Sequence, residues 1–254
     1  MPLHTEFHAT VDGTTGNTYL EPVNAKLLAS SFVAKGSVVR VADPAGHEIV
    51  LDVVAQHGKI DDFLKLAVRT DPPVMTGTVG FRAKMQLSPG TGDVISRLQL
   101  TGSFELSDVQ FTNDKLQARI DALSKRSQGK PQLINDKSGG AIQSEMDGNF
   151  ALRDSLLSLS RLHYSVPGAN IFMTGKYSLD GNEFDFHGKA DLDAKVSQMV
   201  TGWKSVLLKP VDPFFRKNGE TEVPIRVTGT RSEPHFGLDL HHKDSPPEDS
   251  SQKK

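Results

Sequence analysis

The 254-residue chain contains no cysteine. This absence excludes disulfide bridges, cysteine-ligated zinc or iron–sulfur sites, and thiol catalysis. Long apolar runs are also absent, since no stretch approaches the roughly 18 residues that a transmembrane helix needs. The first residues show neither the basic nor the apolar region of a secretory signal. From these absences the chain is expected to be soluble, or to be a piece of a longer protein.

An excess of charge of either sign is missing too. The 29 Lys and Arg residues nearly balance the 31 Asp and Glu residues, which gives a formal charge of −2. A strongly basic nucleic-acid-binding protein, or a polybasic membrane-surface protein, needs a positive field that this composition lacks. No nucleic-acid partner is therefore expected. The hydrophobic content of 37% is that of an ordinary globular chain, so the chain can form a core.

Signatures of catalysis and of cofactor binding are missing as well. The sequence has no phosphate-binding loop, no dinucleotide fingerprint and no nucleophile elbow, and its nine histidines form no HExxH pattern. No enzyme activity, cofactor or metal is expected on these grounds. His187 is interpreted as a solvated residue on a polar strand face. The alternative is a glycan hydrolase that uses the carboxylate pair Glu183 and Asp185.

What the sequence does have is hydrophobicity that alternates with period two. From Val79 to Leu87 the odd positions are apolar, while Gly80 and polar residues occupy the even ones. The same pattern returns over residues 94–106, 171–179 and 184–192. Successive side chains of a strand point to opposite faces, so each segment predicts a ribbon with one apolar and one polar face. This alternation is typical of antiparallel sheets.

Turns and helices complete the predicted fold. Glycine and proline predict hairpin turns at residues 43–46, 88–92 and 180–182. Apolar residues at helical spacing predict helices at residues 59–69, 113–128 and 194–208. The fold class is therefore mainly β: a long antiparallel, meandering, curved sheet, groove-like or sandwich-like, with two or three amphipathic helices. Residues 1–243 are predicted to form one domain, and the polar residues 244–254 a disordered tail.

The apolar side of these strands is the candidate site. If the face is open, its adaptable phenylalanine and methionine side chains suit lipid acyl chains. If the face is covered, it is the core of a structural or interaction module. Alternation is compatible with both. The residues predicted to face lipid are Val79, Phe81, Met85, Leu87, Leu98, Leu100, Phe104, Leu106, Ile171, Met173, Tyr177, Phe184 and Phe186.

The third predicted helix, over residues 194–208, also has two interpretations. It carries Trp203 beside three lysines, which would suit a membrane surface. The favoured interpretation is a helix that plugs the end of the sheet, because its apolar positions are those that a core-facing helix needs.

The order of segments resembles a known family. The run from Gly77 to Pro131 begins with a glycine-led strand and contains the turn Leu87-x-Pro89-Gly90, the strand Leu98-x-Leu100-x-Gly102-x-Phe104, and a helix that ends Leu123-Ser124-x-Arg126. Later come Pro210-x-Asp212-Pro213-Phe214-Phe215 and Pro224-Ile225-x-Val227-x-Gly229-Thr230. These features are similar to the C-terminal region of the AsmA-like family of bacterial envelope proteins. The resemblance covers residues 20–242.

This resemblance implies a role without catalysis. Members of the family are anchored in the inner membrane by an N-terminal helix and extend through the periplasm. They are related to bridge-like lipid-transfer proteins, in which a β-groove gives acyl chains an apolar path. The resemblance therefore implies a location in the cell envelope, phospholipid or other lipid acyl chains as ligands, an envelope protein as a further partner, and a part in outer-membrane assembly and lipid homeostasis.

Overall fold

The computed structural model describes residues 3–6, 8–67, 72–134, 142–179, 183–195, 198, 216–217, 220–230 and 233–238. Its strands are β1 Leu3–Glu6, β2 Ala9–Val11, β3 Thr18–Leu27, β4 Ser30–Ala42, β5 Ala45–Lys59, β6 Met75–Leu87, β7 Leu98–Phe111, β8 Glu145–Arg153, β9 Leu156–Val166, β10 Ala169–Ser178, β11 Glu183–Leu192, β12 Arg216–Lys217, β13 Glu220–Thr230 and β14 Pro234–Leu238. The helices are α1 Ile60–Ala67, α2 Val94–Arg97, α3 Asp114–Ser127 and the short 3₁₀ helix η1 Pro131–Leu133.

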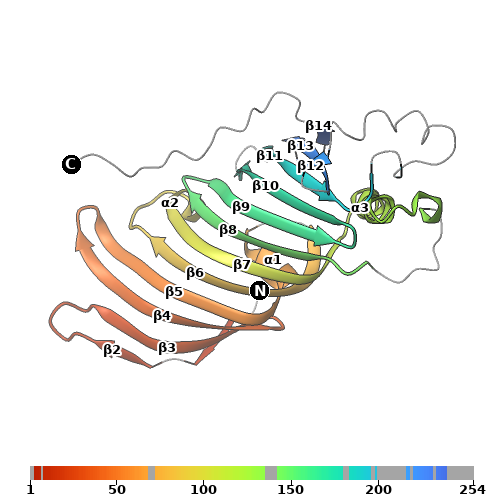
Figure 1. Ribbon diagram of the computed structural model, residues 1–254. Helices are drawn as coiled ribbons and strands as arrows, with labels where there is room; N and C mark the ends of the chain where they lie inside the picture. The colour runs from red at the N-terminus through yellow and green to blue at the C-terminus, as the bar shows by residue number, and fades with distance from the viewer. Residues whose placement is uncertain are drawn as a thin grey trace, which may run out of the picture.

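All the strands belong to one antiparallel sheet. Its main path runs β1-β3-β4-β5-β6-β7-β8-β9-β10-β11-β13-β12, with β2 on β3 and β14 on β13. Strands next to each other in the chain are therefore mostly next to each other in the sheet, as in a meander. The two ends of the path do not pair with each other, so the sheet is open. The sheet is also strongly curved (Figure 1). The predicted fold class, a long curved antiparallel sheet with a few helices, is confirmed.

Two of the predicted helices are present. Helix α1 follows β5 directly, and Asp61 and Asp62 occupy its first turn, where carboxylates favour the helix dipole. Helix α3 begins after Asn113, whose side chain accepts a hydrogen bond from the Leu116 amide at 3.0 Å. Most of the third predicted helix, including Trp203, lies outside the described residues, as do the tail 244–254 and the turn residues 180–182.

The start of one strand was predicted wrongly. Alternation placed Val94 on the apolar face of the strand that contains Leu100, but residues 94–97 form the short helix α2, and Val94 is 50% exposed. The Arg97 guanidinium donates to the carbonyl oxygens of Ser88 and Gly92, which holds the loop folded back on itself. Local hydrogen bonding therefore overrides the apolar pattern until Leu98.

Interruptions in the alternation coincide with β-bulges. In β9 the apolar positions are Leu157 and Leu159 and then shift to Leu162 and Tyr164, and the pairing register with β8 and β10 shifts at the same place. In β5 the series ends at Ala55, and its register with β6 resumes at Gly58. A bulge inserts an extra residue and increases local bending. It thereby returns the apolar side chains to the same face and adds curvature to the sheet.

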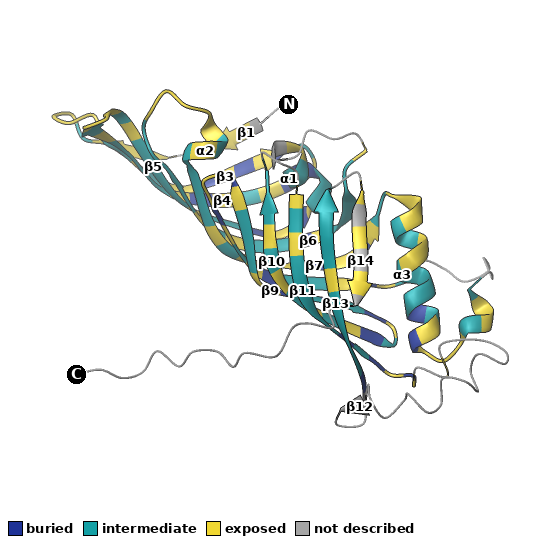
Figure 2. Ribbon diagram, turned by 90° about the horizontal axis from the view of Figure 1, so that it is seen from above, coloured by how far each residue is buried: buried dark blue, intermediate teal, exposed yellow. Residues whose placement is uncertain are grey.

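The sheet bends so that its apolar face is concave. Helix α1 lies on this inner side, and α3 lies beside the sheet with exposed residues along its length (Figure 2). The main core cluster lies at the α3 end of the strands and includes Val79, Leu106, Tyr164 and Ala190, each at most 6% exposed. Ile60 and Phe63 of α1, and Ile120 and Leu123 of α3, pack against it. This end of the sheet is a closed core.

Candidate functional site

The strand register places all the predicted lipid-facing residues on the inner face. Between β6 and β7 the direct cross-strand pairs are Val79–Leu106, Phe81–Phe104, Met85–Leu100 and Leu87–Leu98. Between β10 and β11, Tyr177 is paired with Phe184, and Ile171 and Met173 lie on the same face. Phe186 is paired with Gly175. Directly paired residues share a face, so these side chains form transverse rows that run across the strands.

Two rows define the site. The helix row consists of Val79, Leu106, Met146, Tyr164, Ile171 and Ala190. The rim row consists of Met85, Leu100, Leu152, Leu157, Tyr177 and Phe184. The helix row lies at the α3 end of the strands, and the rim row lies toward the opposite end, beside α2. Every member of both rows is apolar or aromatic.

The helix row is covered. The Phe63 ring of α1 meets the Phe81 ring edge to face, with centroids 4.9 Å apart, and the Phe32 ring in the same way at 6.2 Å. Such aromatic pairs add to the stability that burial provides. Because α3 packs on the same cluster, side chains of the helix row and its neighbours form the closed core. They are not available to a ligand.

The rim row is not part of that core cluster. Leu152 is buried, and the other members are half-buried. Helix α1 packs mainly on β5 and β6, and α3 on β7 and β10, so in the described part of the chain neither helix closes the rim row. We call the concave strip along the rim row the apolar trough. Because the sheet is curved, the side chains of the trough partly bury one another, and a ligand can still contact them.

Phenylalanine–glycine pairs shape the floor of the trough. Phe104 is paired with Gly148, and Phe150 is paired with Gly102. A Cβ atom at Gly148 would lie 2.9 Å from Phe104 Cζ, so the ring occupies the space that a side chain would take. Gly175 leaves room for the Phe186 ring in the same manner. The rings therefore lie flat along the sheet, and the missing side chains permit tight curvature.

Sequence reasoning missed two of the six residues of the rim row. It did not identify Leu152 and Leu157, although residues 146–152 and 157–159 alternate as clearly as the strands that it did identify. The signal in the sequence was the dipeptide Asp154-Ser155 between these two alternating runs. Both residues have positive φ in the structure. Asp is tolerated in that conformation, so the pair marks a tight hairpin between β8 and β9.

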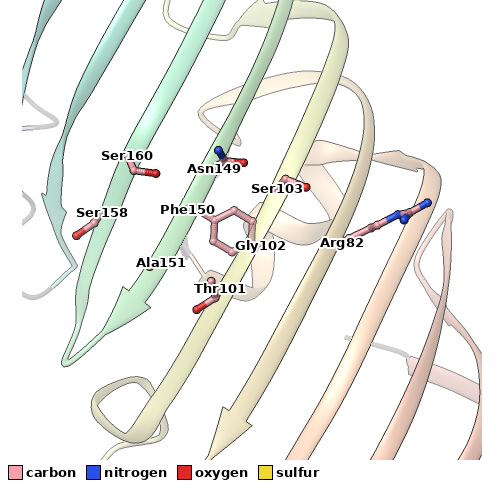
Figure 3. Close-up of a pocket in the computed structure, with 9 residues that line it drawn as sticks. All are labelled: Arg82, Thr101, Gly102, Ser103, Asn149, Phe150, Ala151, Ser158 and Ser160. Carbon is pink, nitrogen blue, oxygen red and sulfur yellow. The ribbon is translucent and has the colours of Figure 1, made fainter. Parts of the chain in front are cut away.

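The outer face of the sheet carries most of the polar side chains, although Val33 and Phe172 are exposed on it too. Figure 3 shows a shallow hollow of about 430 Å³ there, with Arg82, Ser103 and Asn149 around Gly102 and Phe150. A second hollow, of about 650 Å³, contains Glu105, Asp147 and Arg161. Among the described residues no group of His, Cys, Asp or Glu side chains is arranged to hold a metal ion. Hydroxyl groups and Asn149 line both hollows, and the second also contains His57 and charged side chains.

Charged pairs cross the outer face between strands. His163 Nδ1 lies 2.8 Å from Asp147 Oδ1, and the His163 ring stacks on Phe172 with centroids 4.7 Å apart. Lys189 Nζ lies 2.7 Å from Glu222 Oε2. The hydrogen bond with Glu222 raises the pKa of Lys189, against the effect of desolvation and with further support from Asp191. These contacts join β8 to β9, β9 to β10, and β11 to β13, on the side away from the trough.

Asp185, one member of the carboxylate pair considered for glycan hydrolysis, takes part in contacts of this kind. Asp185 Oδ1 lies 3.2 Å from Arg226 Nη2 and 3.1 Å from His187 Nε2. Desolvation raises the pKa of Asp185, but the hydrogen bond from Arg226 and the charge and hydrogen bond of His187 outweigh it and hold the pKa below its ordinary value. His187 thus contacts Asp185, with 26% of its side chain exposed. Glu183 lies at the strand start and is exposed.

No family model, curated protein or solved structure matches this chain. In the described part of the chain, the helices are too short or too polar to cross a bilayer.

Proposed function

We propose that this protein binds lipid acyl chains in the apolar trough and guides them along it without catalysing a reaction. The observation that carries the proposal is the continuity of the inner face. From β3 to β13 the paired positions on that face are apolar or glycine across ten neighbouring strands, except for Thr18 and Ser30 on β3 and β4, the pair Arg40–His47 on β4 and β5, and Thr221 on β13. A protein rarely leaves so large an apolar surface accessible unless a partner occupies it.

The dimensions of the trough suit this ligand. The register continues the rim row through Leu51, Gly36 and Leu20 to β3 and through Gly229 to β13, and the trough includes these positions. Ten strands about 4.8 Å apart give a path of roughly 43 Å across the sheet. Successive rows on one face are about 7 Å apart, since side chains of the same face recur every second residue. The rim row and its neighbours therefore provide a strip only a few side chains wide. This is long enough for an extended acyl chain and too narrow for a folded protein domain.

The polar outer face supports the same proposal. Its ion pairs and hydroxyl groups keep one side of the sheet in water while the other side holds hydrocarbon. The resemblance to AsmA-like proteins supports a place in the cell envelope, with phospholipids as the first ligands to test and with outer-membrane assembly or lipid homeostasis as the setting. In that setting an inner-membrane-anchored parent chain and an envelope protein partner belong to the proposal.

Lipid retention tests the proposal. We expect purified protein to carry phospholipid or fatty acid that native mass spectrometry detects after detergent-free isolation. Leu100→Asp should reduce retention at least tenfold, because it places a charge in the middle of the rim row. Leu100 is preferred to Phe104 or Phe186, whose rings fill the space above glycines, so that a charge there would damage the fold itself.

Thr101→Asp is the matched control. Thr101 is the next residue of β7, it points to the outer face, and it is exposed. It should retain lipid like the unsubstituted protein, and circular dichroism should show that both variants are folded. If the unsubstituted protein binds no lipid, or if both variants retain it equally, the trough is not a lipid site. The inner face is then the core of a structural or interaction module.

A further inference from the structure

Helix α3 and the turn after it carry a concentration of positive charge that the overall composition conceals. Residues 114–134 contain five basic and two acidic side chains, a net charge of +3 in a chain whose net charge is −2. Lys115, Arg119, Arg126 and Lys130 are all exposed. Because a helix turns once per 3.6 residues, Lys115, Arg119 and Arg126 fall within about 40° of one another around the axis. We call these four residues the basic stripe.

The stripe is not explained by the stability of the helix. Lys115 lies in the first turn, where the helix dipole disfavours a cation. Arg119 follows it at i+4, a spacing at which like charges repel. In the described part of the chain neither Lys115 nor Arg126 has a carboxylate within ion-pair distance. Asp121 lies on the other side of the helix, where it accepts a hydrogen bond from Gln117 Nε2 at 2.8 Å.

The position of α3 leaves the stripe accessible. Its apolar residues Ile120 and Leu123 pack on the core cluster. The buried Ser124 donates from its hydroxyl to the Pro167 carbonyl at 2.8 Å, which fixes the rotation of the helix. The basic stripe lies on a different side of the helix, where its residues are exposed, and Figure 2 shows exposed residues along α3. The stripe lies at the closed end of the strands and not in the trough.

An apolar side chain stands next to the stripe. Directly after Lys130 the chain forms η1, which packs on α3, and its Leu133 is 39% exposed. Exposed cations beside an exposed leucine are typical of a surface that lies in the interface of an anionic bilayer. The cations meet lipid phosphates there, and the apolar side chain enters the boundary with the acyl chains. A nucleic-acid site would require stacking aromatic residues as well, and α3 and η1 contain none.

We propose that α3 and η1 form a docking surface for anionic membranes, with the basic stripe on lipid phosphates and Leu133 in the interface. This inference goes beyond the proposed function of the trough and does not depend on it. It also corrects the expectation drawn from net charge. A chain without an overall positive field can still bind an anionic surface, because screening limits electrostatic attraction to about 10 Å, so only the local charge matters.

Vesicle sedimentation tests the docking surface. The full chain should pellet with vesicles of phosphatidylcholine and phosphatidylglycerol, and it should stay in the supernatant with phosphatidylcholine alone. Each cation at an anionic surface is worth roughly a fivefold change in partitioning. The double variant Lys115→Gln and Arg126→Gln should therefore bind about ten- to thirtyfold more weakly. Leu133→Ser should also weaken binding, and raised salt should weaken binding by the unsubstituted chain.

The control removes two cations elsewhere. Lys26 and Lys35 are exposed on β3 and β4, and their double replacement by Gln changes net charge equally. Unchanged binding by this control with loss in the stripe variant supports the surface. Equal loss in both variants, no binding to anionic vesicles, or equally tight binding to a single-stranded oligonucleotide would overturn it. If the stripe variant keeps its bound acyl chains, as we expect, a failure of docking is distinguished from a failure of the trough.

Discussion

At the scale of single residues, glycine determines how the sheet can bend. Phe104 and Phe150 lie on neighbouring strands with centroids 6.3 Å apart, and each covers the glycine of the other strand. The glycines provide the space, and the rings restore the buried apolar area that the missing side chains would have given. A phenylalanine and glycine in direct register are thus one structural unit.

This unit predicts the effect of a single methyl group. A Cβ atom at Gly148 would lie 2.6 Å from the Arg161 carbonyl oxygen and 2.9 Å from Phe104 Cζ. Gly148→Ala should therefore lower the free energy of unfolding by about 1–3 kcal/mol, because backbone cannot move aside as a flexible side chain can. Urea denaturation measures the change. Gly13→Ala, where nothing lies within 4 Å of the added atom, should be nearly neutral; equal effects would contradict this account.

The outer-face network predicts a pH dependence. The folded pKa of Asp185 is below its ordinary value, so its contribution to stability is present above the unfolded pKa of about 3.9 and is lost as the pH falls through the folded pKa. The carboxylate is 55% exposed, so Asp185→Asn should cost less than about 1 kcal/mol at neutral pH. That difference should shrink in acid. Urea titrations at both pH values check this, with Glu183→Gln as the control; a difference independent of pH would contradict it.

At the scale of elements, one buried carboxylate fixes α1 to the sheet. Asp62 is 3% exposed. Its Oδ2 accepts from the Ala29 amide at 3.1 Å and from the Ser30 hydroxyl at 2.7 Å. The Ser30 oxygen in turn accepts from the Lys59 amide at 2.8 Å. Helix α1, which covers the closed core beside the trough, is therefore held by hydrogen bonds to the β3–β4 turn as well as by the packing of Phe63.

Removing this carboxylate should loosen α1. Asp62→Ala leaves the Ala29 amide and the buried Ser30 hydroxyl without their acceptor, which costs about 1–3 kcal/mol. Hydrogen exchange at Ala29 and in α1 should accelerate more than exchange in β8 and β9. Asp61→Ala removes the same charge from the same helix turn without breaking these bonds, and should have a smaller effect. If exchange in α1 is unchanged in Asp62→Ala, the helix is held by packing alone.

The alternation in the sequence was enough to predict the strands β6, β7, β10 and β11 and the face that their paired apolar residues occupy. Even the bulges are visible in the sequence, since the shift from Leu159 to Leu162 marks the register shift in β9. The error at Val94 arose because hydrogen bonds of Arg97 overcame the apolar pattern locally. The coverage of the face could not be predicted, because it depends on contacts such as Asp62 with Ser30, which join distant segments and leave no periodic signal.

At the scale of the whole molecule, the sheet divides its inner face lengthwise. The α3 end of each strand contributes to a closed core, and the other end contributes to the trough. A meander of this kind extends the trough by one row position for each added strand, so the path is essentially one-dimensional. A one-dimensional path has a property that a compact pocket lacks: an obstacle in the middle affects passage more strongly than it affects binding at either end.

This property predicts how a central charge acts. Leu157 of β9 lies in the rim row, paired with Leu152 and Tyr177. In Leu157→Asp, acyl chains can still occupy the trough over β3 to β7, so lipid retention should fall by about half. Transfer of a fluorescent phospholipid between donor and acceptor vesicles should fall at least tenfold. The reason is that a desolvated carboxylate interrupts the trough between the parts on either side of Leu157. Ser158→Asp, on the outer face beside it, should change neither quantity. Equal reductions in retention and transfer by Leu157→Asp would instead indicate a single local binding site, and the trough would then be a pocket rather than a path.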